Sequence, residues 1–391
     1  MVYLDNAATT KMKDSVLEKM LPYFTKNFGN ASSTYTTPGQ NARKGLSEAR
    51  ADVAKAIGAQ SGEIYFTSGG SEADNWAIKG VTLKNKKRGN HIITSTVEHH
   101  AVLHTCQFLE KQGFEVTYLP VDEYGMVSAG DVENAIKDTT VLVTIMFANN
   151  EIGTINPIKE IGAVCKKHGV LFHTDAVQAT GAVTIDVKDM NIDLLSMSAH
   201  KFHGPKGVGA LYIRKGVQIE NLIHGGAQES GKRATTENVA GIVGMAAALS
   251  DATAHMEEKT KRITYLRDKL INGIEKSIPY CRLNGHREKR LPNNVSFCFR
   301  YIEGESLLLS LDIKGFVVSS GSACTSGSLD PSHVLLAIGL PHEIAHGSMR
   351  ATLSEFTTEE EIDEFIKTLG PIVQRLRDMS PLYEGVEKGK E

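Results

Sequence analysis

The segment Leu195-Ser-Met-Ser-Ala-His-Lys-Phe-His-Gly-Pro-Lys-Gly207 places a lysine, Lys201, after an apolar strand pattern and among small and hydrogen-bonding residues. An ordinary lysine has a pKa of about 10.4 and is protonated near pH 7, so it is neither a nucleophile nor a base. To react, it must be desolvated or become part of an imine. The position of Lys201 therefore makes it a candidate for chemistry.

Short apolar strands alternate with helical patterns from about residue 60 to 215. The expected strands are residues 63–66, 91–94, 115–118, 141–146, 170–173, 193–196 and 209–213. This alternation predicts an α/β fold with a mainly parallel sheet that helices cover on both faces. Ligands of such sheets bind where strands end, so functional residues are expected in the loops that follow the strands.

A smaller α+β domain is expected after the sheet. The pattern is helical from about residue 236 to 276 and changes there from apolar-rich to charged. Strands follow at residues 294–299 and 315–318, and a capping box, Thr358 to Glu361, begins a closing helix. We predict a large domain of residues 15–255 and a small domain of residues 1–14 and 256–391.

The charge balance excludes some function classes. With 43 basic and 46 acidic residues the net charge is −3, so neither nucleic acid nor an anionic membrane is an expected partner. No apolar run approaches the roughly 18 to 20 residues of a membrane span, and the first residues lack a signal pattern. A cytoplasmic location is expected. Five cysteines without a CxxC spacing suggest neither a disulfide framework nor a zinc knuckle.

Two further loops carry polar residues at strand ends. The turn Thr67-Ser-Gly-Gly-Ser-Glu-Ala-Asp-Asn75 offers glycines and unpaired N–H groups, as an anion site or as ordinary helix capping. Asp175 follows a strand that reads as buried, so it belongs to an ion pair or contacts a ligand. A lysine, an acid and a phosphate turn together match the needs of pyridoxal phosphate: a Schiff base, a partner for the pyridine nitrogen and charge neutralisation.

Cys324 stands apart from the other cysteines. Cys106, Cys165, Cys281 and Cys298 lie in apolar or regular stretches, whereas residues 319–328 around Cys324 are small and polar, as in a loop. A thiol with a pKa of about 8.5 is only a few per cent thiolate at pH 7, so a nucleophilic cysteine needs help to ionise. From the residues alone, both an inert and a nucleophilic role are possible.

One motif points to a different chemistry. His342-Glu-Ile-Ala-His346 matches the H-E-x-x-H pattern of zinc peptidases. That site needs a continuous helix and a third ligand, but Pro341 and Gly347 leave barely a turn and a half. A short surface helix is favoured, and no metal is expected there or at His100 and His104.

The ordered motifs along the chain resemble the cysteine desulfurases of the NifS/IscS type. These are pyridoxal-phosphate enzymes of fold type I, which is similar to aspartate aminotransferase. The motifs span nearly the whole chain: Tyr3-Leu-Asp-Asn-Ala-Ala-Thr-Thr10, Phe28-Gly-Asn-Ala-Ser-Ser33, Thr94-Ser-Thr-Val-Glu-His99, Asn149-Asn-Glu-Ile-Gly153, Ser319-Ser-Gly-Ser-Ala-Cys324 and Arg350.

The resemblance implies a role for each matching residue. Lys201 holds the cofactor, Asp175 pairs with its ring nitrogen, and His99 lies against the ring and moves protons. The remaining contacts implied are Asn150 and Gln178 to the ring hydroxyl, Gly70, Ser71, Ser198 and His200 to the phosphate, and Thr236 to the phosphate of a second subunit. Arg350 is implied to bind the substrate carboxylate, although a salt bridge within its own lobe is the alternative. Cys324 is implied to be the nucleophile.

The implied reaction converts L-cysteine to L-alanine and leaves a persulfide on Cys324. A homodimer would then pass the sulfur to an acceptor protein, such as an iron–sulfur scaffold, or to tRNA or cofactor thiolation. Selenocysteine lyase and cysteine-sulfinate desulfinase are alternatives on the same fold, and a zinc peptidase using His342 and His346 is a remote one. The chain departs from the family pattern where proline, histidine and glycine are usual, at Ala31, Tyr35 and Thr235.

Overall fold

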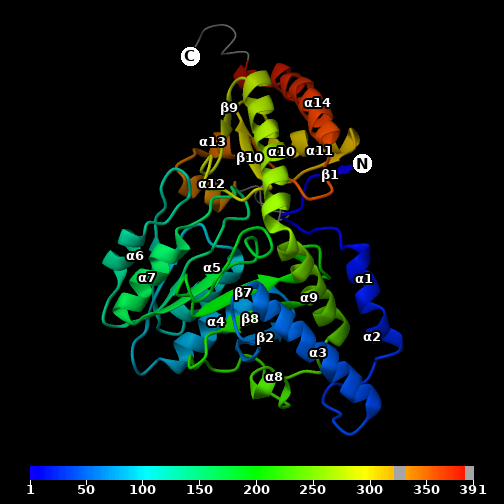
Figure 1. Ribbon diagram of the computed structural model, residues 1–391. Helices are drawn as coiled ribbons and strands as arrows, with labels where there is room; N and C mark the ends of the chain where they lie inside the picture. Colours follow the sequence, from blue (N-terminus) through cyan, green and yellow to red (C-terminus); the bar gives the residue numbers. More distant parts are fainter. Residues whose placement is uncertain (321–330, 384–391) are drawn as a thin grey trace.

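The computed structural model describes residues 1–320 and 331–383. A seven-stranded sheet in the order β2-β8-β7-β6-β5-β3-β4 forms its centre (Figure 1). Only β8 runs antiparallel, to both β2 and β7. The mainly parallel sheet predicted from the sequence is confirmed. Its strands are β2 (Ile64–Thr67), β3 (His91–Ser95), β4 (Glu115–Leu119), β5 (Thr140–Thr144), β6 (Leu171–Asp175), β7 (Leu194–Ser198) and β8 (Gly209–Ile213).

Helices cover both faces of this sheet because successive strand residues point to opposite sides. Leu194 packs into one apolar cluster with α4 (Gly70–Lys84) and α5 (His100–Glu110). Its neighbour Leu195 belongs to the cluster of the other face. The helices of that second face are α1 (Asp14–Met20), α3 (Thr37–Ala56), α6 (Ala129–Ala135), α7 (Ile158–His168) and α9 (Val239–Ala254).

A second, antiparallel sheet forms the core of the smaller part of the molecule, at the top of Figure 1. Phe297 and Phe365 are fully buried in its apolar cluster, and α14 begins with the predicted capping box between Thr358 and Glu361. The elements are β9 (Cys281–Leu283), β10 (Asn294–Phe299), β12 (Ser348–Thr352), α10 (Met256–Ser277), α11 (Gly304–Ile313) and α14 (Glu359–Asp378).

The two parts are joined by α9 and α10, whose axes meet at an angle of 76°. The bend lies at His255, where the sequence predicts the boundary between the domains, and we keep that division as a prediction. Among the described residues, no helix taken singly has the length and apolar character to cross a membrane. The bent pair of α9 and α10 passes that test by length and composition alone.

The N-terminal segment connects both parts. β1 (Val2–Tyr3) pairs with β11 (Phe316–Val317), and the Ala7 N–H donates to Thr352 Oγ1 at 2.8 Å. The remaining short elements are α2 (Pro22–Thr25), η1 (Ser61–Glu63), η2 (Ala199–Lys201), α8 (Gln228–Gly231), α12 (His333–Ala337) and α13 (His342–Ala345).

α13 carries the H-E-x-x-H motif. His342–Ala345 makes a single turn just before β12, as the short surface helix was predicted to do. Within residues 1–320 and 331–383, no group of three or more His, Cys, Asp or Glu side chains could hold a metal ion.

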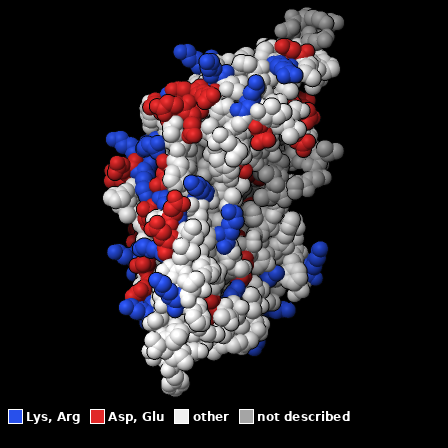
Figure 2. Space-filling model, turned by 90° about the vertical axis from the view of Figure 1, so that its right-hand side faces the viewer, with Lys and Arg blue, Asp and Glu red and all other residues white. Residues whose placement is uncertain are grey.

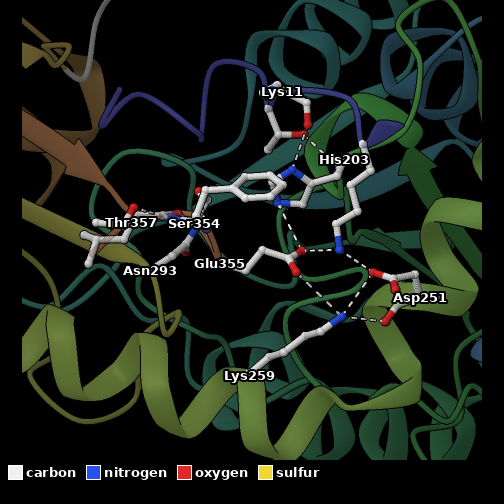
Figure 3. Close-up of polar contacts among 12 residues, drawn as sticks. Lys11, His203, Asp251, Lys259, Asn293, Ser354, Glu355 and Thr357 are labelled. Atoms are coloured by element: carbon white, nitrogen blue, oxygen red, sulfur yellow. Dashed lines mark hydrogen bonds and ion pairs between the residues drawn. The ribbon is translucent and has the colours of Figure 1, made fainter. Parts of the chain in front are cut away.

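A network of ion pairs fastens the two parts together. Figure 3 shows His203 and Lys259 directed at Glu355, with Asp251 beside Lys259. Lys259 Nζ lies 3.1 Å from Asp251 Oδ2 and 3.8 Å from Glu355 Oε2, while His203 Nε2 lies 3.8 Å from Glu355 Oε1. Lys13 pairs with both carboxylates and is mostly buried. Glu355, from the loop after β12, therefore pairs with lysines of the N-terminal segment and of α10 and lies beside the imidazole of His203, whose pKa is lowered by burial.

We expect Glu355→Gln to destabilise the protein by about 1.5 to 3 kcal/mol, because two lysines would lose a charged partner. Urea unfolding measures this cost. The matched control is Glu48→Gln, whose carboxylate forms an exposed pair with Lys44 at 3.9 Å and should cost less than about 0.5 kcal/mol. Equal losses in the two variants would contradict a stabilising role for the network.

Candidate active site

A cavity of about 340 Å³ lies at the carboxyl ends of β6 and β7. This is the edge at which α/β sheets bind ligands, and the volume is at the lower end of the roughly 300 to 1,000 Å³ of small-molecule sites. The cavity brings together most of the residues singled out from the sequence: Gly70, Ser71, His99, Asn150, Asp175, Gln178, Ser198, His200, Lys201 and Arg350. Ala7, Ala8, Asp74, Met146, Ala148 and Val177 complete the lining.

Lys201 ends η2, the turn that follows β7. Its Nζ donates hydrogen bonds to the carbonyl oxygens of Ala7 at 2.5 Å and Ala8 at 2.8 Å. The same N-terminal segment is tied to the turn beside Lys201, because the Thr10 N–H donates to the His200 carbonyl at 2.9 Å. Burial, together with the charges of Lys201 and Lys206, lowers the pKa of His200 to about 4, so the imidazole is neutral at pH 7.

Asp175 is buried at the end of β6. It is the last residue of the strand, rather than the residue after it, because β6 stays paired with β7 up to Ser196. Its Oδ1 accepts the Val177 N–H at 2.9 Å. Burial raises the pKa of Asp175, whereas His99, the Val177 N–H and Lys201 act to lower it. This buried acid can serve a protonated ring nitrogen as partner.

His99 caps the N-terminus of α5 and lines the same cavity. Its Nδ1 accepts the Ala101 N–H at 3.1 Å, so the proton of the neutral ring is on Nε2. Burial lowers the pKa of His99 although the charge of Asp175 opposes this, and Lys201 and His104 lower it further. His99 is therefore a neutral imidazole with one N–H to offer.

The start of α4 has the donor groups that an anion requires. A Cβ on Gly70 would lie 2.6 Å from Val177 Cγ2, so only glycine fits there without displacing its neighbour. The first backbone N–H groups of a helix lack partners within the helix and favour anions. Glu72, in the first turn, is bound by Arg233 through two contacts of 2.8 and 2.9 Å, so its charge is compensated. The donor set fits a phosphate.

Arg350 is buried in β12 and already has partners in the protein. Its Nη2 donates to Asp5 Oδ1 at 2.9 Å, and its Nη1 donates to the Asn150 carbonyl at 3.0 Å. The salt bridge that the sequence left open is thus present. Nε, also buried, has no hydrogen-bond partner among the described residues. Each Nη atom carries two N–H groups and the bonds to Asp5 and Asn150 use one of each, so donors remain for a ligand.

The structure does not describe every predicted site residue or bring it into the cavity. Thr236 is exposed and does not line it, and Cys324 lies outside the described residues. Three of the other cysteines are buried, and burial raises the pKa of Cys106 and Cys165 to about 12, so their thiols stay protonated at neutral pH.

The three departures from the family pattern lie in different surroundings. Thr235 has a φ of 149°, a conformation that favours the glycine usual at this position. Ala31 is buried, and Tyr35 is 98 % exposed.

Sequence reasoning missed Ala7, Ala8 and Asp74. The two alanines act through backbone carbonyls, which no side-chain motif reveals. Asp74 did leave a signal, because it interrupts the apolar stripe of α4 formed by Ala73, Ala77, Ile78 and Val81.

Comparison with known proteins agrees with this geometry. The aminotransferase class-V family matches residues 2–365. Cysteine desulfurase IscS of Clostridium botulinum is 62% identical over 392 residues, which is 100% of this chain and 98% of the relative. A solved NifS-like protein has a TM-score of 0.90 at 41% identity and covers 96% of this chain and 100% of its own. SspA in complex with cysteine has a TM-score of 0.81 at 39% identity, over 92% and 100%. The chain therefore belongs to the aminotransferase class-V family, among the cysteine desulfurases of the IscS and NifS type.

Proposed function

We propose that this cysteine desulfurase binds pyridoxal phosphate in the cavity around Lys201 and transfers the sulfur of L-cysteine to Cys324. The family is pyridoxal-phosphate-dependent, and its full-length relatives are cysteine desulfurases. The observation that carries the proposal is the meeting of Lys201, Asp175 and the start of α4 in one cavity.

When bound, pyridoxal phosphate supplies an aldehyde that condenses with amines and a pyridinium ring that accepts electrons from the adjacent carbon. Lys201 holds it covalently, and Asp175 keeps the ring nitrogen protonated. Gly70, Ser71, Ser198 and His200 donate hydrogen bonds to the phosphate, while Asn150 and Gln178 lie toward the ring hydroxyl. His99 presents its Nε2–H to the cavity and moves protons during the reaction.

Arg350 binds the substrate carboxylate. Asp5 and the Asn150 carbonyl fix its guanidinium through both Nη atoms. The second N–H of each Nη is not used by these two bonds, and a planar guanidinium suits a contact with a carboxylate. Asp5 is then a positioning residue. When substrate binds, Asp5 and the substrate carboxylate share the positive charge of Arg350.

Cys324 can reach the cavity. The Ser319 N–H bonds the Arg350 carbonyl at 3.0 Å, and His333 Nε2 contacts the Glu98 carbonyl at 3.0 Å, so the chain is anchored beside the cavity before and after Cys324. Cys324 is five positions after Ser319 in the sequence, and an extended chain spans at most about 3.6 Å per residue, or about 18 Å in all. The thiolate forms an S–S bond to the substrate sulfur as the C–S bond breaks. The electron pair of that bond remains with the carbon skeleton, which gains a proton and leaves as alanine.

A homodimer completes the proposal. Figure 2 shows the side on which α1 and α2 lie, and a wide area of it carries few charged side chains. Leu21, Phe24, Phe28 and Tyr35 are at least half exposed in or after these helices. A second copy would cover them and bring its Thr236 to the phosphate. The persulfide then passes to a sulfur-acceptor protein, such as an iron–sulfur scaffold.

We expect Cys324→Ala to abolish sulfide release from L-cysteine while the bound cofactor keeps its visible absorption, because the nucleophile is lost and the cavity is unchanged. Sulfide assays with and without a reductant, together with a spectrum of the same sample, measure both effects. Cys281→Ala, at a half-buried thiol, is the control and should retain turnover. Full turnover by Cys324→Ala would refute its role as nucleophile.

We expect Lys201→Ala to bind pyridoxal phosphate without a covalent bond, so that borohydride reduction followed by denaturation leaves no cofactor on the chain. The wild-type protein retains it under the same treatment, and mass spectrometry reads the difference. Lys206→Ala, five residues along the chain and exposed, serves as control. If Lys201→Ala retained the reduced cofactor, the cofactor would be attached to an amine other than that of Lys201.

We expect Thr236→Ala to weaken pyridoxal-phosphate binding roughly 10- to 150-fold, the effect of losing a hydrogen bond to a charged group. Mixing this variant with Lys201→Ala should restore activity, since a heterodimer has one site with both residues intact if Thr236 acts across the interface. No recovery after demonstrated subunit exchange would mean that Thr236 does not act in trans.

A further inference from the structure

Asp74 is a buried acid that the proposed mechanism does not use. It is 1% exposed and lies on the face of α4 that packs against the sheet. It also lines the cavity that contains Asp175 and Lys201. Carboxyl groups are rarely buried this deeply unless they are paired with a cation or carry a proton.

The basic side chain recorded beside Asp74 among the described residues is His173, whose Nε2 lies 3.7 Å from Asp74 Oδ1. That Oδ1 has no hydrogen-bond partner in the part of the chain that the structure describes. His173 is itself fully buried between the hydroxyls of Thr144 at 2.8 Å and Ser196 at 2.9 Å. Burial lowers the pKa of His173 to about 3, so it is neutral at pH 7 and brings no positive charge.

The other groups around Asp74 favour its neutral form. β6 contributes Asp175 as well as His173, the turn after β3 contributes Glu98, and α5 contributes Cys106 to the same side of the sheet. Glu98 Oε1 accepts the Ser95 hydroxyl at 2.6 Å and the Met146 N–H at 3.0 Å, while its Oε2 lacks a partner. Burial and the charges of Asp175 and Glu98 raise the pKa of Asp74 well above its usual value, against a hydrogen bond from Ser196.

An ionised Asp74 would also oppose the ligand. The anion site at Gly70 and Ser71 begins the helix to which Asp74 belongs, four residues before it. A phosphate there and the carboxylate of Asp175 already put two negative groups in one cavity. A third charge, in a medium of low dielectric constant, would repel both.

We propose that Asp74 holds a proton at neutral pH and acts as a positioning residue, leaving Asp175 as the ionised partner of the cofactor's ring nitrogen. The role of Asp175 as partner of the cofactor's ring nitrogen depends on the proposed function. The protonation of Asp74 does not, because every group invoked for it belongs to the protein.

The first test compares wild-type protein with Asp74→Asn, a close mimic of the protonated acid, without added cofactor. The unfolded Asp74 side chain ionises near pH 4, whereas the folded protein keeps its proton to higher pH, so stability from this group is lost as pH rises between the two pKa values. We expect Asp74→Asn to become the more stable protein, its unfolding constant falling up to tenfold per pH unit relative to wild type. Urea unfolding from pH 5 to 9 measures it.

The matched control is Asp52→Asn, at an exposed acid of α3, for which the stability difference should stay constant with pH. A pH-independent difference between Asp74→Asn and wild type would overturn the proposal. If Asp74→Asn does not fold, carbon NMR of aspartate-labelled wild-type protein replaces it. The carboxyl signal assigned to Asp74, as distinct from that of Asp175, must then titrate far above pH 4, and an ordinary titration of that signal would overturn the proposal.

The second test measures binding of pyridoxine 5′-phosphate, which lacks the aldehyde and so cannot bond to Lys201. Calorimetry at pH 6.5 to 9 should show that wild-type affinity falls relative to Asp74→Asn once Asp74 ionises, by up to tenfold per pH unit. Parallel affinities at all pH values would refute the effect on the ligand. Failure of both proteins to bind would count against the proposed cofactor site, while the unfolding test still decides the proton on Asp74.

Discussion

The parallel pairing of β5, β6 and β7 is the constraint on which the active site depends. Parallel strands end at one edge, and the register of β6 and β7 places Asp175 opposite Ser196, a few residues before Lys201. The pairing of the two strands therefore places Asp175 and Lys201 at the same cavity. The helix after β2 begins at this edge as well, because β8 joins β2 to β7 within the sheet. The hydrogen-bonded sheet thus fixes the relative positions of Lys201, Asp175 and the start of α4.

The N-terminal segment is the second determinant of the site. Asp5 holds Arg350, the carbonyls of Ala7 and Ala8 hold the Lys201 amine, and the Thr10 N–H holds the turn at His200. Lys13 then joins the ion pairs around Glu355. Residues near the start of the chain thereby bind both Lys201, beside the large sheet, and Arg350, in the small sheet. Both parts of the molecule therefore contribute side chains to one cavity.

The sequence predicts much of this arrangement. Periodicity locates all seven strands of the large sheet to within a few residues, and the family motifs identify the residues that the cavity brings together. What the sequence could not supply depends on packing. The salt bridge between Asp5 and Arg350 joins positions 345 residues apart, and the contacts of Lys201 run to backbone carbonyls that any residue would provide. Asp74 was visible as an interruption of an apolar stripe, but its surroundings emerge only when α4 docks against β6 and β7. Cys324 lies outside the described residues, so its role rests on the family motif and on the anchoring of its neighbours.

The bond between Asp5 and Arg350 also sets an order of events during synthesis. A ribosome releases the chain from its N-terminus, so residues up to about 213 can form the large sheet while Arg350 has not yet been made. The segment that contains Ala7 can meet Lys201 at that stage, but Asp5 must wait for nearly the whole chain to emerge. The lysine side of the cavity can thus assemble early, whereas the arginine side closes only at the end of translation. A chain truncated before β12 would keep Lys201 and yet never gain the arginine side of the cavity.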